Sequence, residues 1–298
     1  IQALMLPGAE VGLDALFTPD WLKLTDSSIW IAAYGQIFFS LSVGFGIMLT
    51  YSSYLKKKTN LTSSGLVVAF ANSSFEILAG IGIFAALGFI AVQSGQAVNE
   101  VVSSGVGLAF IGFPVILSEA PMGNLLGVLF FSSLVFAGFT SLVSIQEVVI
   151  SAVKDKLGCG RVKATLLVGL PSAIVSIALF STTTSLNLLD LTDAFINSFG
   201  IVAVSLAIIM TVSAGYGALP VLRNHLNSVS SFKVGRGWQL LAAGLTPIVL
   251  GYTLINSIQE RLADGYGDMP SLFVGVFGWG MALSLPVIAW LLSKLSWS

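Results

Sequence analysis

The 298-residue chain is 55% hydrophobic, only 9% charged and close to neutral, with a net charge of −1. Soluble domains carry about 25% charged residues, so this composition excludes a soluble enzyme and a nucleic-acid-binding protein. A single cysteine and a single histidine exclude an internal disulfide and a metal cluster built on those residues. We therefore expect a multi-pass membrane protein.

Apolar runs of about 18 or more residues predict membrane-spanning helices. After a loop at 1–26, such runs predict a single transmembrane domain over 27–293, followed by a short tail at 294–298. The stretch 95–120 is interrupted by glycine and proline, and we expect a structured extracellular loop there instead of a span. The seven expected spans are 27–54, 62–93, 123–153, 162–181, 187–212, 237–259 and 270–293.

Small residues interrupt the first of these spans. Its centre contains Ser40, Ser42, Gly44 and Gly46, and each glycine weakens a helix by about 1 kcal/mol relative to alanine. Unwound backbone at membrane depth is tolerated only where it is buried in protein or lines a cavity. We therefore expect a break near residues 40–45 whose free carbonyls can face a cation. Close helix packing through small residues is the alternative explanation.

Basic residues predict the orientation of the spans. When the seven spans alternate, eleven of the thirteen basic residues lie on one side, and only Lys23 and Arg261 lie on the other. Cytoplasmic loops carry the excess of lysine and arginine. The C-terminus is therefore expected in the cytoplasm of a plasma-membrane protein. Because this arrangement has an odd number of spans, we also expect further spans before Ile1.

Two spans carry polar groups that a lipid-facing helix does not need. In the second span, Asn72 and Glu76 are four residues apart and share one helix face. A buried carboxylate must be paired, hydrated or protonated. The third span has a stripe of small and hydroxyl residues, which suits either helix packing or a hard cation such as sodium. The stripe consists of Ser133, Ala137, Thr140, Ser141 and Ser144.

The residues of the first span also carry a resemblance to a known family. Trp30 to Ala33, followed by GQIFFSLSVGFG at 35–46, resembles the sixth helix of the neurotransmitter:sodium symporter family. The segments 12–20 and 50–54 on either side are similar to that family as well, and the likeness continues through FAGFTS at 136–141. It weakens over the last three spans.

The resemblance implies an all-α membrane protein of about seven transmembrane helices. The chain would be the second half of an inverted-repeat (5+5) transporter fold, holding helices six to twelve with a discontinuous first helix. Helices one to five would be missing partners of this chain. Substrate and ion ligands on the absent helices cannot be named from this sequence.

The resemblance also implies two sodium sites and no organic cofactor. The first sodium ion would be held by Ser40 and Asn72. The second would be held by the Ala137 carbonyl and by the hydroxyls of Thr140 and Ser141. Glu76, with Gln36 nearby, stands where chloride-dependent members of the family hold chloride. We therefore expect chloride independence, with Glu76 able to carry a proton on the return step.

The same resemblance assigns the substrate pocket and the gates. The pocket residues would be Phe39, Ser40, Ser42, Phe45, Ser141 and Ile145. The outer gate would be formed by Phe39 and Asp193, and the inner gate by Tyr54 and Asp155. The arginine partners of both gate carboxylates would lie on the missing helices, and the role of Glu147 near the inner gate stays open.

These observations predict sodium-coupled symport of a neutral, hydrophobic amino acid across the lipid bilayer by alternating access. A proton-coupled amino-acid transporter of a related broken-helix fold, with Glu76 as the proton carrier, is the alternative. An intramembrane enzyme needs a nucleophile with a base, a metal cluster or paired carboxylates. The predicted spans contain none of these, so we do not expect an enzyme.

Overall fold

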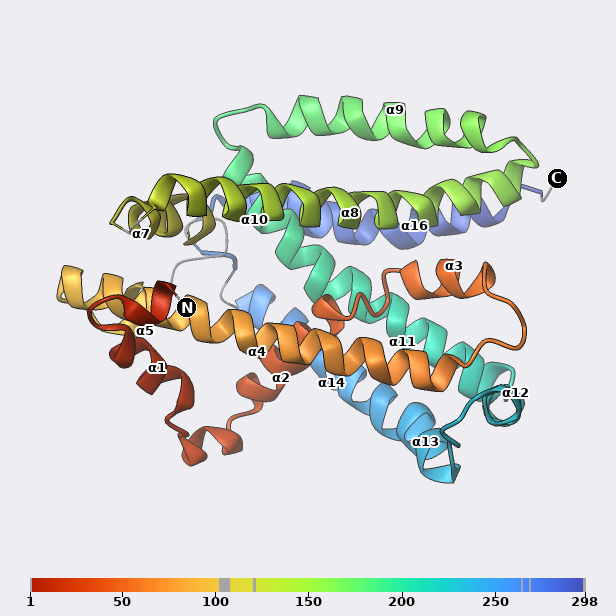
Figure 1. The fold of residues 1–298 in the computed structure, drawn as a ribbon. Coiled ribbons are helices and arrows are strands. Elements are labelled where there is room, and N and C mark those ends of the chain that lie inside the picture. Colours follow the sequence, from red (N-terminus) through yellow and green to blue (C-terminus); the bar gives the residue numbers. More distant parts are fainter. Residues whose placement is uncertain (1, 102–107, 120–121, 264, 268, 297–298) are drawn as a thin grey trace. The chain divides into compact units, whose positions relative to one another are not determined.

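The computed structural model describes residues 2–101, 108–119, 122–263, 265–267 and 269–296. These residues form helices joined by loops (Figure 1), which confirms the prediction of an all-helical membrane fold. Within the described ranges, six helical stretches are long and apolar enough to cross a membrane. They are Leu61–Ser94, Gly123–Leu157, Arg161–Phe180, Ser185–Gly215, Arg236–Ala263 and Ser271–Ser293.

The first predicted span is divided into two helices, each too short to cross a bilayer alone. They are α2 (Ser27–Ser40) and α3 (Ile47–Ser53), and residues 41–46 between them are not helical. Gly44 and Gly46 have φ angles of 84° and 80°, a region that glycine enters without steric cost. Ser42 also has a positive φ, at 52°, which is uncommon for a residue with a side chain. The expected discontinuity is therefore present, at 41–46.

The chain forms two compact units. Unit 1 comprises Ile1–Ile29 and Leu66–Ser141, and unit 2 comprises Trp30–Gly65 and Leu142–Ser298. The helices α4 (Leu61–Ser94) and α8 (Gly123–Leu157) each contribute residues to both units. The single transmembrane domain expected from the sequence stays a prediction.

Unit 1 is organised around α4. Its α1 helix approaches α4 so closely that a Cβ atom on Gly12 would lie 1.7 Å from the Phe84 carbonyl oxygen. Only glycine therefore fits at this crossing. The predicted loop at 95–120 contains short helices, although residues 102–107 and 120 lie outside the described part of the chain. The remaining elements of the unit are η1 (Gln2–Met5), α1 (Ala9–Phe17), η2 (Trp21–Thr25), α5 (Val98–Val101), η3 (Leu108–Gly112) and α7 (Phe113–Glu119).

Unit 2 contains the remaining long helices, several of which include π-helical turns. Its core packs Leu191, Phe195, Phe199 and Val274 together, and the Trp279 ring lies edge-on to Phe195 with the centroids 5.3 Å apart. The first group of elements is α9 (Arg161–Phe180), α10 (Ser185–Phe195), η4 (Ile196–Ile201), α11 (Val202–Met210), η5 (Thr211–Gly215) and α12 (Leu219–Val229). The second is α13 (Arg236–Leu240), η6 (Leu241–Leu245), α14 (Thr246–Ala263), α15 (Ser271–Phe273), η7 (Val274–Gly280) and α16 (Met281–Ser293).

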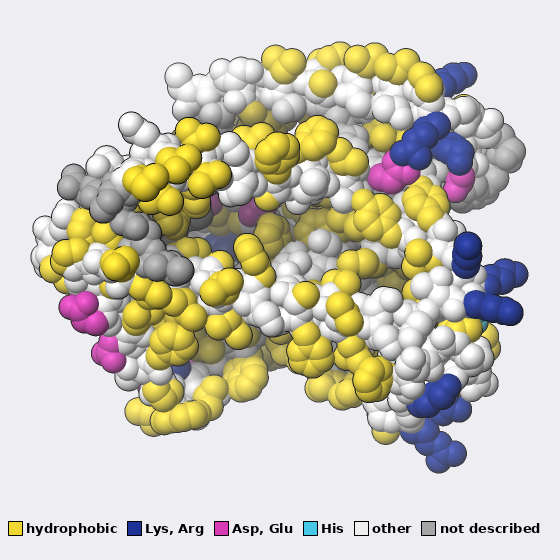
Figure 2. Space-filling model, viewed as in Figure 1, with side chains coloured by type: hydrophobic (Ala, Val, Ile, Leu, Met, Phe, Trp, Pro, Cys, Tyr) yellow, Lys and Arg dark blue, Asp and Glu magenta, His cyan; other side chains and the backbone are white. Residues whose placement is uncertain are grey.

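Lysine and arginine side chains gather along one edge of unit 2 (Figure 2). This edge contains the loop after α3, the α8–α9 turn, and the segments around α12 and α13 (Figure 1). Such clustering is expected of cytoplasmic loops. It supports the predicted orientation, which stays a prediction.

Candidate functional site

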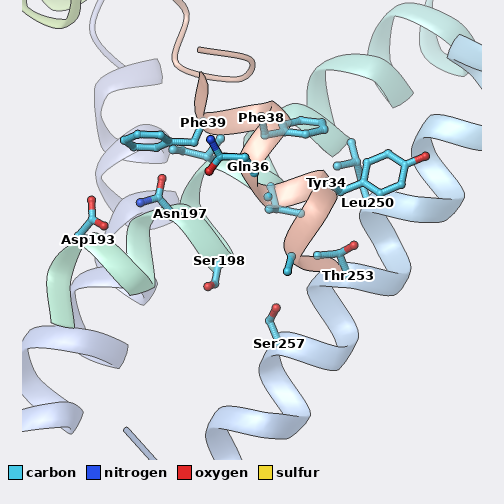
Figure 3. A pocket seen from close by; sticks show the side chains of 14 residues that line it. Tyr34, Gln36, Phe38, Phe39, Asp193, Asn197, Ser198, Leu250, Thr253 and Ser257 are labelled. Carbon is cyan, nitrogen blue, oxygen red and sulfur yellow. The ribbon is translucent and has the colours of Figure 1, made fainter. Parts of the chain in front are cut away.

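Unit 2 contains a half-open cavity of about 360 Å³ beside α2, the N-terminal part of the broken helix (Figure 3). Its walls come from α2, from the stretch α10–η4–α11, and from α14. Three residues predicted from the sequence line it together, namely Gln36, Phe39 and Asp193. The other lining residues are Ala32, Tyr34, Gly35, Phe38, Asn197, Ser198, Ile201, Val202, Leu250, Thr253 and Ser257.

The polar side of the cavity is built from residues one helical turn apart. Asp193 of α10 and Asn197 of η4 are four residues apart, and both line the cavity. Thr253 and Ser257 share one face of α14, and Thr253 is buried. In Figure 3 the side chains of Ser198 and Ser257 point into the space between the helices. The cavity therefore combines one carboxylate, two amides and several hydroxyls with aromatic and aliphatic walls.

The sequence prediction missed Asn197, Ser198, Thr253 and Ser257. Asn197 and Ser198 lie in the π-helical turn η4, whose wider turn changes the face on which each residue lies. Such turns often occur at functional sites. The four-residue spacings from Asp193 to Asn197 and from Thr253 to Ser257 were visible in the sequence. These spacings indicate site residues only once the structure shows that α10 and α14 face the same cavity.

The two phenylalanines predicted as substrate walls contact each other across the break. The rings of Phe39 and Phe45 meet edge to face, with centroids 6.2 Å apart. The Ser40 hydroxyl lies 3.5 Å from the Ile37 carbonyl oxygen, at the end of α2. The aromatic walls and the unwound backbone are thus parts of one local structure.

The predicted sodium ligands lie partly in the other unit. Asn72 and Glu76 are half-buried on one face of α4, in unit 1. On α8, the Thr140 hydroxyl donates to the Ala137 carbonyl at 2.9 Å, so two predicted ligands of the second sodium ion are neighbours. Ser141 follows directly on the same helix. Ser40, Ser42 and Ile145 belong to unit 2. Both sodium sites and the complete substrate site remain predictions.

A second polar cluster surrounds Glu147 on α8. The Tyr54 hydroxyl lies 2.8 Å from Glu147 Oε1 and 3.2 Å from Ser151 Oγ. Arg161, at the start of α9, donates to Glu147 Oε2 at 2.8 Å. The Glu147 carboxylate is therefore held between a phenol and a guanidinium. Asp155, the carboxylate predicted for the inner gate, is exposed. The sequence prediction chose Tyr54 and did not find Arg161.

Removing the guanidinium should destabilise this cluster measurably. The Glu147 side chain is 11% exposed, whereas that of Arg161 is 71% exposed, so water compensates for part of the loss. We expect Arg161→Ala to lower the free energy of unfolding by about 1–2 kcal/mol. Thermal unfolding of the detergent-solubilised protein measures this, with Lys163→Ala as the matched control on the same helix. Equal melting temperatures for the two variants would show that the Arg161–Glu147 ion pair does not stabilise the protein.

The loop between α14 and α15 is attached to α10 through Tyr266. Its hydroxyl donates to Asp190 Oδ2 at 2.9 Å, and the Arg261 guanidinium lies 4.7 Å from the centre of its ring. Burial, and then the hydrogen bond to Asp190, raise the pKa of Tyr266 to about 12. This contact holds the loop next to the helix that carries Asp193.

The raised pKa predicts a pH dependence of this loop contact. Because the pKa in the folded state lies above the ordinary value of 10.0, the contact stabilises the protein fully below pH 10. Its contribution is lost as the pH rises through about 12. Phenolate absorbance, taken as the difference between the protein and Tyr266→Phe, should titrate near 12. A difference signal with a midpoint near 10 would contradict this prediction.

These features define an integral membrane protein of the transporter type, with long apolar helices, one helix broken between α2 and α3, and a mainly apolar cavity with a polar side next to α2. The model of the sodium:neurotransmitter symporter family matches residues 1–298, and the chain belongs to this family. The resemblance seen in the sequence is thereby confirmed. The family consists of sodium-dependent transporters and not of enzymes.

Curated relatives agree with this assignment. The chain is 39% identical to an uncharacterized sodium-dependent transporter of Methanocaldococcus jannaschii, over 99% of this chain and 60% of the relative. It is 30% identical to the sodium- and chloride-dependent glycine transporter 2 of Xenopus laevis, over 94% of this chain and 36% of the relative. An uncharacterized sodium-dependent transporter of Haemophilus influenzae is 35% identical over 56% of this chain. The chain thus spans 60% or less of the length of these relatives.

Proposed function

We propose that this chain is part of a sodium-coupled symporter for a neutral, hydrophobic amino acid that works by alternating access. The observation that carries the proposal is the break at 41–46 beside a cavity lined by Phe39 and Asp193, in a member of a sodium-dependent transporter family. Broken helices offer carbonyls to cations and amides to anionic substrate groups. Preceding helices, one to five in the family's order, would supply the other half of each site.

The chemistry of the predicted pocket favours a zwitterion with an apolar side chain. Carbonyls near Phe39 and Ser40, with the Ser42 hydroxyl, would take the ammonium group. Phe39 and Phe45, already in contact, would form the apolar walls together with Ile145, and Ser141 would lie at the border with the ion site. A relative named as a glycine transporter is consistent with a neutral amino acid as the substrate class.

Two sodium ions would occupy neutral oxygen sites, which suit a hard cation. Ser40 and Asn72 would hold the first, and Ala137, Thr140 and Ser141 the second. Since Ser40 would serve both the ion and the substrate, each ligand would strengthen binding of the other. Glu76, with Gln36 nearby, would supply the negative charge that chloride supplies in the relative named chloride-dependent.

The cavity lined by Asp193 and the polar cluster around Glu147 would contain the two gates. Phe39 and Asp193 would close the outer side, where they already line one cavity. On the inner side, Tyr54 would act with Glu147 and Arg161. Asp155 would form an ion pair with a basic residue of the preceding helices. The C-terminus would then lie in the cytoplasm.

Uptake into proteoliposomes tests the proposal. The intact transporter that contains residues 1–298 should take up a labelled neutral, hydrophobic amino acid when sodium is high outside. A potassium gradient of equal size should drive no uptake. Uptake that follows a proton gradient and ignores sodium would reject sodium coupling and favour the proton-coupled alternative through Glu76.

A further inference from the structure

Ser205 on α11 has a buried hydroxyl that makes no hydrogen bond to any residue the structure describes. The residue is 8% exposed. Other hydroxyls further along the same membrane span donate to the carbonyl one turn earlier, Thr211 to Ala207 at 2.7 Å and Ser213 to Ile209 at 2.6 Å. Buried polar groups almost always have a partner, so the Ser205 hydroxyl requires an explanation.

The hydroxyl lies against the broken segment. A Cβ atom on Gly44 would fall 2.1 Å from Ser205 Oγ and 2.9 Å from Ile201 Cγ2. Ser205 therefore occupies the space that a side chain at position 44 would need. Ile201 also lines the cavity described above, so this contact lies one helical turn from the candidate site.

The broken segment also has backbone groups without partners. The amides of Leu41, Ser42 and Val43 donate to carbonyls at the end of α2. In the part of the chain that the structure describes, the amides of Gly44, Phe45 and Gly46 make no hydrogen bond. Free polar groups are therefore present on both sides of one tight contact, a rotatable hydroxyl on α11 and amides on the break.

We infer that Ser205 is a positioning residue for the break, and that its hydroxyl hydrogen-bonds the freed backbone of 44–46, directly or through one water, as the segment moves. A hydroxyl both donates and accepts hydrogen bonds, so it can pair with either a free backbone amide or a free backbone carbonyl. The inference rests on the proposed function, because the break carries the groups assigned to substrate and sodium. Ser205 does not line the cavity described above.

Hydrogen–deuterium exchange of the intact transporter tests this role independently of transport. We expect Ser205→Ala to speed exchange in the peptide covering 41–46 by about fivefold, the loss expected for one net hydrogen bond. Ser205→Cys, which keeps the size but bonds weakly, should behave like the alanine variant. Ser205→Thr should exchange like the unmodified protein, as should Ser213→Ala, the matched control.

Transport and stability provide the second readout. Ser205→Ala should reduce the maximal uptake rate about fivefold with an unchanged melting temperature, and Ser205→Thr should restore the rate. Unchanged exchange in Ser205→Ala, or an equal change in the threonine variant, would overturn the inference. Absence of sodium-driven uptake by the unmodified protein would reject the proposed function, while the exchange experiment would still decide the role of Ser205.

Discussion

Replacing Asn72 with alanine should remove the sodium dependence of substrate binding in the intact transporter. A hard cation prefers oxygen ligands, and the amide of Asn72 is a proposed first-sodium ligand on a half-buried face of α4. Loss of an outer-sphere partner already lowers metal affinity about 10–100-fold, so loss of a direct ligand should exceed that range. Thr140→Ala should weaken the second site similarly. Titration of substrate binding with sodium measures both effects.

A matched variant separates ion binding from helix packing. Ser133 lies on the same stripe of α8 as Thr140, and its hydroxyl donates to the Phe130 carbonyl at 2.7 Å. Ser133→Ala should leave the sodium titration unchanged. A sodium titration of Asn72→Ala and Thr140→Ala equal to that of Ser133→Ala would remove the basis for both proposed ion sites.

Replacing Glu76 with serine should make transport depend on chloride, because we propose that the unmodified protein needs none. The carboxylate of Glu76 would balance the charge of the bound sodium ions, and its removal would leave an uncompensated buried positive charge, which is costly. A chloride ion near Gln36 and Asn72 would then restore the balance. We expect uptake by Glu76→Ser to fall at least tenfold when gluconate replaces chloride, an effect of about 1.4 kcal/mol or more.

Two controls make this prediction specific. Glu100, an exposed residue of the short helix α5, tests for a general effect of losing a carboxylate, and Glu100→Ser should remain indifferent to chloride. Glu76→Gln should lose activity in both anions, because the amide would fill the space that the anion needs. Chloride dependence of the unmodified protein would show that Glu76 does not replace the anion.

The sequence was most informative where backbone geometry depends on one residue type. Gly44 and Gly46 predicted a break, and both have positive φ angles that other residues rarely adopt. Long apolar runs predicted the remaining spans because hydrophobic length is set by the bilayer. For example, the run at 62–93 corresponds to α4, Leu61–Ser94.

Groups that depend on how helices meet were less predictable. The pairing of Glu147 with Arg161 requires the geometry of the α8–α9 turn, and the sequence assigned such arginines to absent helices. Thr253 and Ser257 become site residues only because α14 faces the same cavity as Asp193. The π-helical turn η4 changes the register after Asp193, and simple helical periodicity gives no sign of that change.

The most direct test is a high-resolution experimental structure of the intact transporter in sodium with a bound neutral amino acid. We predict unwound backbone at 41–46, a cation between Ser40 and Asn72, and the amino acid beside Phe39 and Ser42. A continuous helix through residues 38–46 that faces lipid, with no polar space between it and the hydroxyls around Thr140, would contradict the account.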